Sequence, residues 1–195
     1  MVYAKWMRYD EQTNALDYLE KCYHFIKTVD KERQNWKWVI ITLHSAIYGF
    51  AISACRGTNS DSVIQRTKRG HERLIDFDEA LKRCQDPNWM RVNIDYKYYR
   101  LSNQQKESIR ILHKVFRNNF EHFTPKSWSI EIHDMPTMIL DCFDVVKNLV
   151  VYSDVGWRLK IGKLRKAKSI IYNSKKVIKK SLLYKETLEL ISKTK

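Results

Sequence analysis

The stretch from Trp36 to Arg56 constrains the fold of this chain more than any other. Its apolar residues recur on most sides of a helix, while Thr42, His44, Ser45 and Ser53 lie inside it. The apolar run has about the minimum length of a membrane span, but its polar members fit a helix buried by protein better. We therefore predict a central core helix that ends at Gly57, and no membrane association.

Further helices are predicted wherever apolar residues recur at three- and four-residue steps, over about residues 13–32, 76–84, 102–123 and 134–150. Ser102 and Gln105 form a capping box, and Pro136 follows Asp134 as a helix start. Pro87 and Pro125 are expected to close the helices before them. Residues 63–75 and 86–101 have no clear period. With only 5 Gly and 3 Pro, the chain is predicted to be an all-α bundle of four to five main helices.

Positive charge is concentrated at the C-terminal end. Residues 155–195 hold 13 Lys and Arg against 2 Glu, a net charge of +11 out of the formal +14 of the whole chain. We therefore predict two parts, a near-neutral helical domain at 1–154 and a basic, helical C-terminal extension at 155–195. Such a segment attracts nucleic-acid phosphates or anionic lipid, although it can also be a solvated tail.

Cysteine usage and the N-terminal residues indicate the cellular compartment. Cys22, Cys55, Cys84 and Cys142 lie far apart in apolar contexts, as expected of buried thiols in a reducing cytoplasm. Residues 1–12 lack the apolar core of a signal peptide, so a cytoplasmic location is predicted. No cluster of His, Cys or carboxylates has metal-site spacing, and no phosphate-binding loop is present. Neither a metal nor a cofactor is expected.

A polar motif at the end of the fourth predicted helix is the candidate functional centre. It is Arg117-Asn118-x-x-x-His122, flanked by aromatic residues and followed by Pro125. Asn118 and His122 are four residues apart and share a helix face, whereas Arg117 and His122 lie roughly 140° apart on a regular helix. The two could cooperate only across a dimer, or if the helix unwinds before Pro125. Alternatively, Arg117 and Glu121 form a plain surface ion pair, or His122 is a helix-terminal residue.

The motif resembles the R-x4-H signature of the HEPN superfamily, in which a polar residue, often Asn, follows the arginine. The order of helices over roughly residues 13–154 is also similar to that family. The resemblance implies a HEPN-like bundle that acts as a metal-independent endoribonuclease, often a toxin or an antiphage-defence effector. It also implies a homodimer whose active site lies at the interface, with RNA as the substrate and an antitoxin or defence-complex protein as a further partner.

Roles follow from the residue types. Histidine moves protons near neutral pH, and arginine is a permanent, bidentate partner for phosphate oxygens. Arg117, Asn118 and His122 are therefore the predicted catalytic residues. Substrate-binding candidates near the motif are Asn119, Lys114, Lys126 and Trp128, although Trp128 could equally cover the helix end. His44 is expected to be a core residue, and His113 could flank the site. The alternatives are a non-catalytic HEPN module that binds RNA, a nucleotide or a protein, and an interaction subunit that docks through its basic segment.

Overall fold

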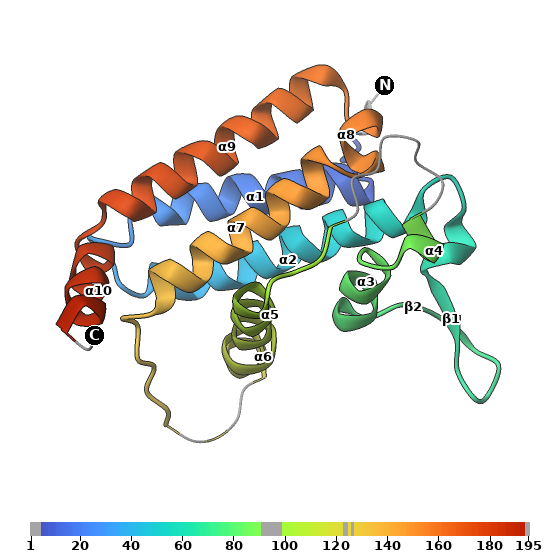
Figure 1. Ribbon diagram of the computed structural model, residues 1–195. Helices are drawn as coiled ribbons and strands as arrows, with labels where there is room; N and C mark the ends of the chain where they lie inside the picture. Colours follow the sequence, from blue (N-terminus) through green and yellow to red (C-terminus); the bar gives the residue numbers. More distant parts are fainter. Residues whose placement is uncertain (1–4, 91–98, 123–124, 126, 194–195) are drawn as a thin grey trace.

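The computed structural model describes residues 5–90, 99–122, 125 and 127–193. Within them the chain is all-α, as predicted, apart from one short two-stranded hairpin. The long helices lie side by side in a bundle, and the hairpin projects from one end (Figure 1).

Helices α1 (Glu11–Ile26) and α2 (Asn35–Arg56) form an antiparallel pair at the centre of the bundle. A capping box starts α1, because the Thr13 amide donates to Asp10 Oδ1 at 2.6 Å and the Asp10 amide donates to Thr13 Oγ1 at 2.9 Å. Gly57 ends α2 with φ of 51°, as predicted. Of the described helices, α2 alone is long and apolar enough to cross a membrane. Within its most apolar stretch of 18 residues, 72% is buried inside the protein.

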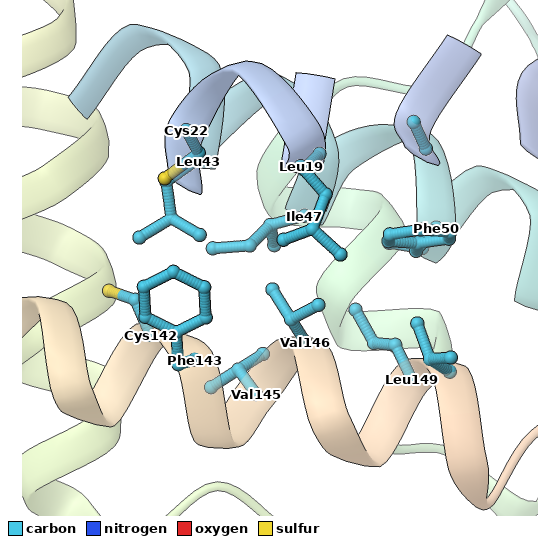
Figure 2. Packing of buried hydrophobic residues seen from close by; sticks show 14 of the residues in the cluster. Leu19, Cys22, Leu43, Ile47, Phe50, Cys142, Phe143, Val145, Val146 and Leu149 are labelled. Atoms are coloured by element: carbon cyan, nitrogen blue, oxygen red, sulfur yellow. The ribbon is translucent and has the colours of Figure 1, made fainter. Parts of the chain in front are cut away.

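Helix α7 (Met135–Val151) completes the central core by lying across α2. Figure 2 shows Phe143, Val146 and Leu149 of α7 facing Leu43 and Ile47 of α2, and all five are buried. Pro136 lies in the first turn as predicted, but Asp134 makes no side-chain cap. Its carbonyl instead accepts from Thr137 Oγ1 at 2.8 Å.

Residues 57–90 form a compact insertion at the end of α2. A short 3₁₀ turn η1 (Ser60–Val63) leads into strands β1 (Ile64–Arg66) and β2 (Glu72–Leu74), which pair antiparallel with Gln65 opposite Arg73. This hairpin accounts for the segment whose sequence had no clear period. Helix α3 (Phe77–Arg83) follows. Pro87 was expected to close this helix. It instead begins a further helical turn, α4 (Pro87–Met90).

The fourth predicted helix is one continuous rod in three parts. These are α5 (Asn103–Arg110), the π-helical segment η2 (Ile111–Arg117) and α6 (Asn118–Glu121). Its start is the predicted capping box, in which the Gln105 amide donates to Ser102 Oγ at 3.1 Å and the Ser102 amide donates to Gln105 Oε1 at 3.0 Å. The π turns of η2, in which an amide bonds to the carbonyl five residues earlier, were not predicted.

The basic segment forms helices α8 (Asp154–Arg158), α9 (Ile161–Lys180) and α10 (Leu182–Lys193). The predicted boundary at 154 coincides with the start of α8, but the residues beyond it share the core of those before it. Helix α9 packs on both α1 and α7 and buries Ala167, Ile170, Ile171 and Ile178. Part of the segment that looked like a solvated extension is therefore a structural helix of the bundle.

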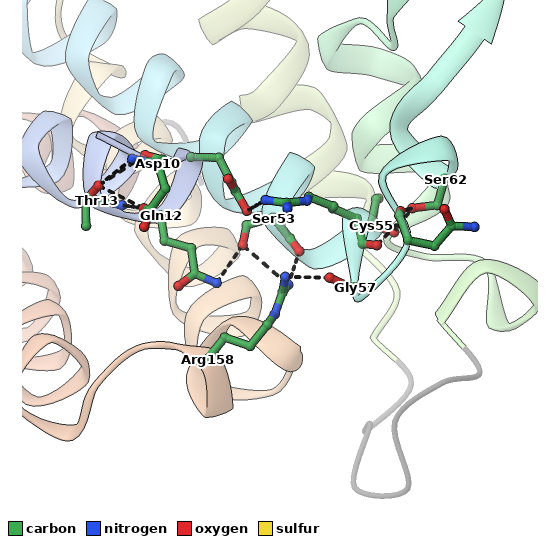
Figure 3. Close-up of polar contacts among 11 residues, drawn as sticks. Asp10, Gln12, Thr13, Ser53, Cys55, Gly57, Ser62 and Arg158 are labelled. Atoms are coloured by element: carbon green, nitrogen blue, oxygen red, sulfur yellow. Dashed lines mark hydrogen bonds and ion pairs between the residues drawn. The ribbon is translucent and has the colours of Figure 1, made fainter. Parts of the chain in front are cut away.

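Arg158 of α8 ties this segment to the end of α2 (Figure 3). Its Nη1 donates to the Gly57 carbonyl at 2.8 Å, and its Nη2 donates to the Ser53 carbonyl. Gln12 Nε2 of α1 donates to the Ser53 hydroxyl at 3.0 Å. The two Arg158 bonds satisfy carbonyls that the end of α2 leaves without helical partners.

Candidate functional site

Arg117 lies where the π turns end and α6 begins. The Asn118 amide reaches back to the His113 carbonyl, the five-residue step of a π turn. The Arg117 guanidinium is held by two neighbours: Nη2 pairs with Glu121 Oε2 at 2.5 Å, and Nη1 donates to Asn118 Oδ1 at 3.1 Å. The ion pair that the sequence allowed is therefore present. It fixes the direction of the guanidinium and also neutralises part of its charge.

His122 lies immediately beyond the helix. The helix ends at Glu121, and His122 has φ of −97° and ψ of 107°, an extended backbone. Its amide still donates to the Asn118 carbonyl at 2.9 Å, and its side chain is exposed. The helix thus unwinds before Pro125, which is one of the two conditions that the spacing of Arg117 and His122 demanded. The imidazole is released from the position that a regular helix would impose on it.

A pair of histidines beside Arg117 is the part of the site that sequence reasoning missed. His44 Nε2 of α2 lies 2.9 Å from His113 Nδ1 of η2, a hydrogen bond between rings. Phe77, the first residue of α3, stacks on both, with ring centroids 4.3 Å from His44 and 4.5 Å from His113. Three elements far apart in the sequence therefore meet at one cluster. The sequence indicates His113 only as a possible neighbour of the motif, and His44 only as a core residue.

Asp78 and Lys114 form the outer edge of this cluster. Asp78 Oδ2 pairs with Lys114 Nζ at 2.5 Å, and Asp78 Oδ1 lies 3.9 Å from His113 Nε2. His113 is consequently placed between a carboxylate on one ring nitrogen and a second histidine on the other. If His44 donates to Nδ1 of His113, the remaining N–H of His113 points toward Asp78.

Burial keeps both rings neutral at physiological pH. It lowers the pKa of His44 to about 3, and the neighbouring His113 and Arg117 add to this lowering. Burial also lowers the pKa of His113, with a further contribution from Lys114 that Asp78 partly offsets. A histidine with a pKa of about 3 is a weak base near neutral pH. The pair is therefore a neutral, hydrogen-bonded unit that lies next to the Arg117 cation.

The predicted substrate-binding residues that the structure describes are engaged with partners inside the protein. Asn119 Nδ2 donates to the Val115 carbonyl at 2.7 Å within the helix. Lys114 pairs with Asp78, as described above. Trp128 packs on Phe120 with ring centroids 5.1 Å apart, the second of its two predicted roles, and 39% of it remains exposed. Lys126 lies outside the described residues.

Metal and thiol chemistry find little support in the described part of the chain. No group of three or more His, Cys, Asp or Glu there could hold a metal ion. All four cysteines are buried thiols, as predicted, and burial raises the pKa of Cys22 to about 12. These thiols are core residues rather than nucleophiles.

Comparison of the chain with protein-family models, with curated proteins and with solved structures found no match. The functional interpretation therefore depends on the residues and their geometry.

Proposed function

We propose that this protein is a metal-independent endoribonuclease of the HEPN type. The observation that carries the proposal is the end of the α5–η2–α6 helix, where Asn118 holds the Arg117 guanidinium and the helix unwinds at His122. π-Helical turns such as those of η2 occur frequently at functional sites. The overall positive charge of the chain favours a polyanionic substrate.

The proposed reaction needs a base, an acid and a cation at the scissile phosphate. The 2′-oxygen of the RNA attacks the adjacent phosphorus, forming a 2′,3′-cyclic phosphate, and the 5′-oxygen of the next nucleotide leaves. A neutral imidazole takes the 2′-OH proton, and a protonated imidazole gives a proton to the departing 5′-oxygen. Arg117 binds the non-bridging oxygens, whose charge grows in the transition state. Asn118 is the positioning residue for Arg117.

Two imidazoles in opposite protonation states are needed at one scissile bond. A homodimer with this helix end at its interface supplies His122 twice, once from each copy. The exposed side chain of His122 is compatible with such an arrangement. The dimer is part of the proposal, as is a role as a toxin or antiphage effector controlled by a partner protein.

One observation favours a second candidate, a non-catalytic module that binds RNA or a partner. Glu121 lies 2.5 Å from the Arg117 guanidinium, so a phosphate must displace or share it. Replacing Glu121 with Gln separates the two candidates. In a nuclease, Glu121→Gln frees the guanidinium for phosphate and cleavage is retained or rises. In a binding module, no cleavage appears in either form.

The direct test incubates purified protein with labelled RNA in the presence of EDTA. Cleavage is expected to survive EDTA and to leave 2′,3′-cyclic phosphate ends. The His122→Ala variant is expected to lose about 10²- to 10⁴-fold in rate, the usual contribution of general acid–base catalysis. Arg117→Ala is expected to lose a similar factor, because a charge-stabilising donor contributes about 10²–10³.

Matched controls on the same protein are Arg110→Ala and His71→Ala. Arg110 is an exposed arginine of the same rod that pairs with Glu107 at 2.7 Å, and His71 is exposed in the hairpin turn. Both controls are expected to cleave like the wild type. Full activity in Arg117→Ala and His122→Ala would show that the site is elsewhere. Toxicity of the wild type on expression in bacteria, absent in His122→Ala, would support the toxin role.

A further inference from the structure

A groove between α7 and α9 gathers lysine side chains on one face of the protein. It has a volume of about 650 Å³. Its basic lining consists of Lys147 from α7 and five lysines from α9, which are Lys168, Lys175, Lys176, Lys179 and Lys180. Of these six groove lysines, only Lys175 has an acidic partner among the described residues, Asp144 at 2.5 Å. The groove therefore brings together mutually repelling ammonium groups, and an anion would relieve that repulsion.

Helical spacing explains why these side chains form a stripe. Lys168, Tyr172, Lys175 and Lys179 are separated by four, three and four residues, so they share one face of α9. At about 1.5 Å per residue, Lys168 and Lys179 are roughly 16 Å apart along the helix axis. This length suits an extended chain of phosphates better than a single small anion.

Tyr172 adds an aromatic surface to the same stripe. It lines the groove and is 68% exposed, so much of its side chain faces solvent. Lysines that follow a backbone, next to an exposed aromatic ring, are the two elements of single-strand binding sites. Each base stacked on such a ring contributes about 1–3 kcal/mol.

A membrane surface fits these observations less well. An amphipathic helix that binds lipid inserts a broad apolar face beside its lysines. In α9 that face is already used, because Ile170, Ile171 and Ile178 are buried within the bundle. Besides Tyr172, the apolar lining of the groove consists of Val151, which is half-buried, and Ile171, which is buried, so little apolar surface is left there to insert.

We propose that the α7–α9 groove is a binding site for single-stranded RNA, with phosphates on its lysines and an unpaired base stacked on Tyr172. The site deepens the proposed nuclease function by holding substrate on an element separate from the Arg117–His122 helix. It does not require cleavage, so the two proposals can fail independently.

The test measures binding of a fluorescent single-stranded RNA by anisotropy, using the full chain and 2′-O-methyl RNA, which cannot be cleaved through its 2′-oxygen. The triple variant Lys168→Gln/Lys176→Gln/Lys179→Gln is expected to bind at least about tenfold more weakly at low salt. The slope of log affinity against log salt is expected to fall by about 2, because each phosphate that a lysine neutralises contributes about 0.7 to that slope. Tyr172→Ala is expected to weaken binding by about five- to 150-fold, the equivalent of removing one stacked base.

The matched control removes three charges from the hairpin, which projects from the bundle away from α9 (Figure 1). It is Lys68→Gln/Arg69→Gln/Arg73→Gln, three residues that are all exposed. Equal weakening in this control and in the groove variant would overturn the proposal in favour of non-specific attraction. An unchanged affinity in the groove variant would also overturn it.

Three further outcomes are informative, and the last two separate the proposals from each other. Sedimentation with phosphatidylserine vesicles, without RNA binding, would assign the groove to a lipid surface and overturn the proposal. RNA binding that is lost in the groove variant, in a protein that never cleaves unmodified RNA, would support the groove and remove the proposed nuclease function. Cleavage with no dependence of RNA affinity on the groove lysines would do the reverse.

Discussion

His44 makes the stability of this protein depend on pH between neutrality and mild acid. Its side chain is only 6% exposed, and its pKa is lowered from 6.5 to about 3. As the pH falls, the unfolded chain binds a proton at this histidine before the folded protein does. The stability contributed by neutral His44 is therefore complete above about pH 6.5 and is lost as the pH falls from there toward 3.

The magnitude follows from linkage. Within that window the free energy of unfolding falls by about 1.4 kcal/mol per pH unit. Between pH 7 and pH 5 the loss is about 2 kcal/mol, because the unfolded histidine titrates only around 6.5 at the upper end. The lowered pKa of His113 adds a loss of the same sign. Asp10, whose pKa is lowered from 3.8 mainly by the Thr13 amide, contributes only at more acidic pH.

The assay is urea unfolding followed by circular dichroism at pH 7 and pH 5. With a slope of about 2 kcal/mol per molar urea, the midpoint of the wild type is expected to fall by about 1 M or more. In His44→Phe, which keeps an aromatic ring against Phe77, the difference between the two pH values is expected to shrink by about 2 kcal/mol. His71→Gln, a change at an exposed histidine, serves as the control and should leave the pH difference unchanged.

The change in unfolding free energy between pH 7 and pH 5, and not the absolute stability, tests whether His44 is neutral in the folded protein. His44→Phe removes the hydrogen bond to His113, so its absolute stability is expected to fall at both pH values. If the variant loses as much stability from pH 7 to pH 5 as the wild type does, His44 titrates alike in the folded and unfolded states. The cluster would then be open to water and protonated like an ordinary surface histidine, and the reasoning on its neutral state would be refuted.

Three other experiments test how the helices are held together. Gly49→Ala places a methyl group 2.8 Å from Ala15 Cβ, so it should destabilise the protein by about 1–2 kcal/mol despite a better helix propensity, as urea unfolding would show. Adding Ala15→Gly to Gly49→Ala should restore the stability, and a double variant without that rescue would contradict the close approach of α1 and α2. The control is Gly162→Ala, which should not destabilise the protein because no atom lies within 4 Å of the added methyl group. Arg158→Met should cost about 1–3 kcal/mol in the same assay, because the Gly57 and Ser53 carbonyls lose their donor, and wild-type stability would contradict that role. The four cysteines should react with a thiol reagent at pH 8 only after denaturation, since all are buried, and rapid labelling of the native protein would count against that burial.

Local sequence was sufficient for the helices themselves. The capping box at Ser102–Gln105 forms as predicted, and the box that the structure adds at Asp10–Thr13 likewise involves residues three apart. The stop at Gly57 and the burial of α2 also follow from neighbours along the chain. Such features depend on backbone groups within one turn, which explains why the all-α class could be predicted from periodicity and caps.

Within the candidate site, the sequence located one element only. The Arg117–Glu121 pair and the unwinding at His122 are local, and both were anticipated from spacing and from Pro125. Trp128 had two predicted roles, and its packing against Phe120 was observed only in the folded chain. The assignment of catalytic roles to these residues stays a prediction.

Tertiary structure decided the rest, because it joins residues that no local rule relates. His44 and His113 are 69 positions apart, and their hydrogen bond exists only because η2 packs on α2. Helix α9 has the composition of a solvated basic helix, yet its apolar side completes the core against α1 and α7. The sequence alone determined the all-α class, most helix starts and which faces are apolar, but it did not place the end of α1, which is Ile26 and not residue 32. Which apolar faces meet, and which polar side chains are sealed in between them, depends on how the whole chain fills space.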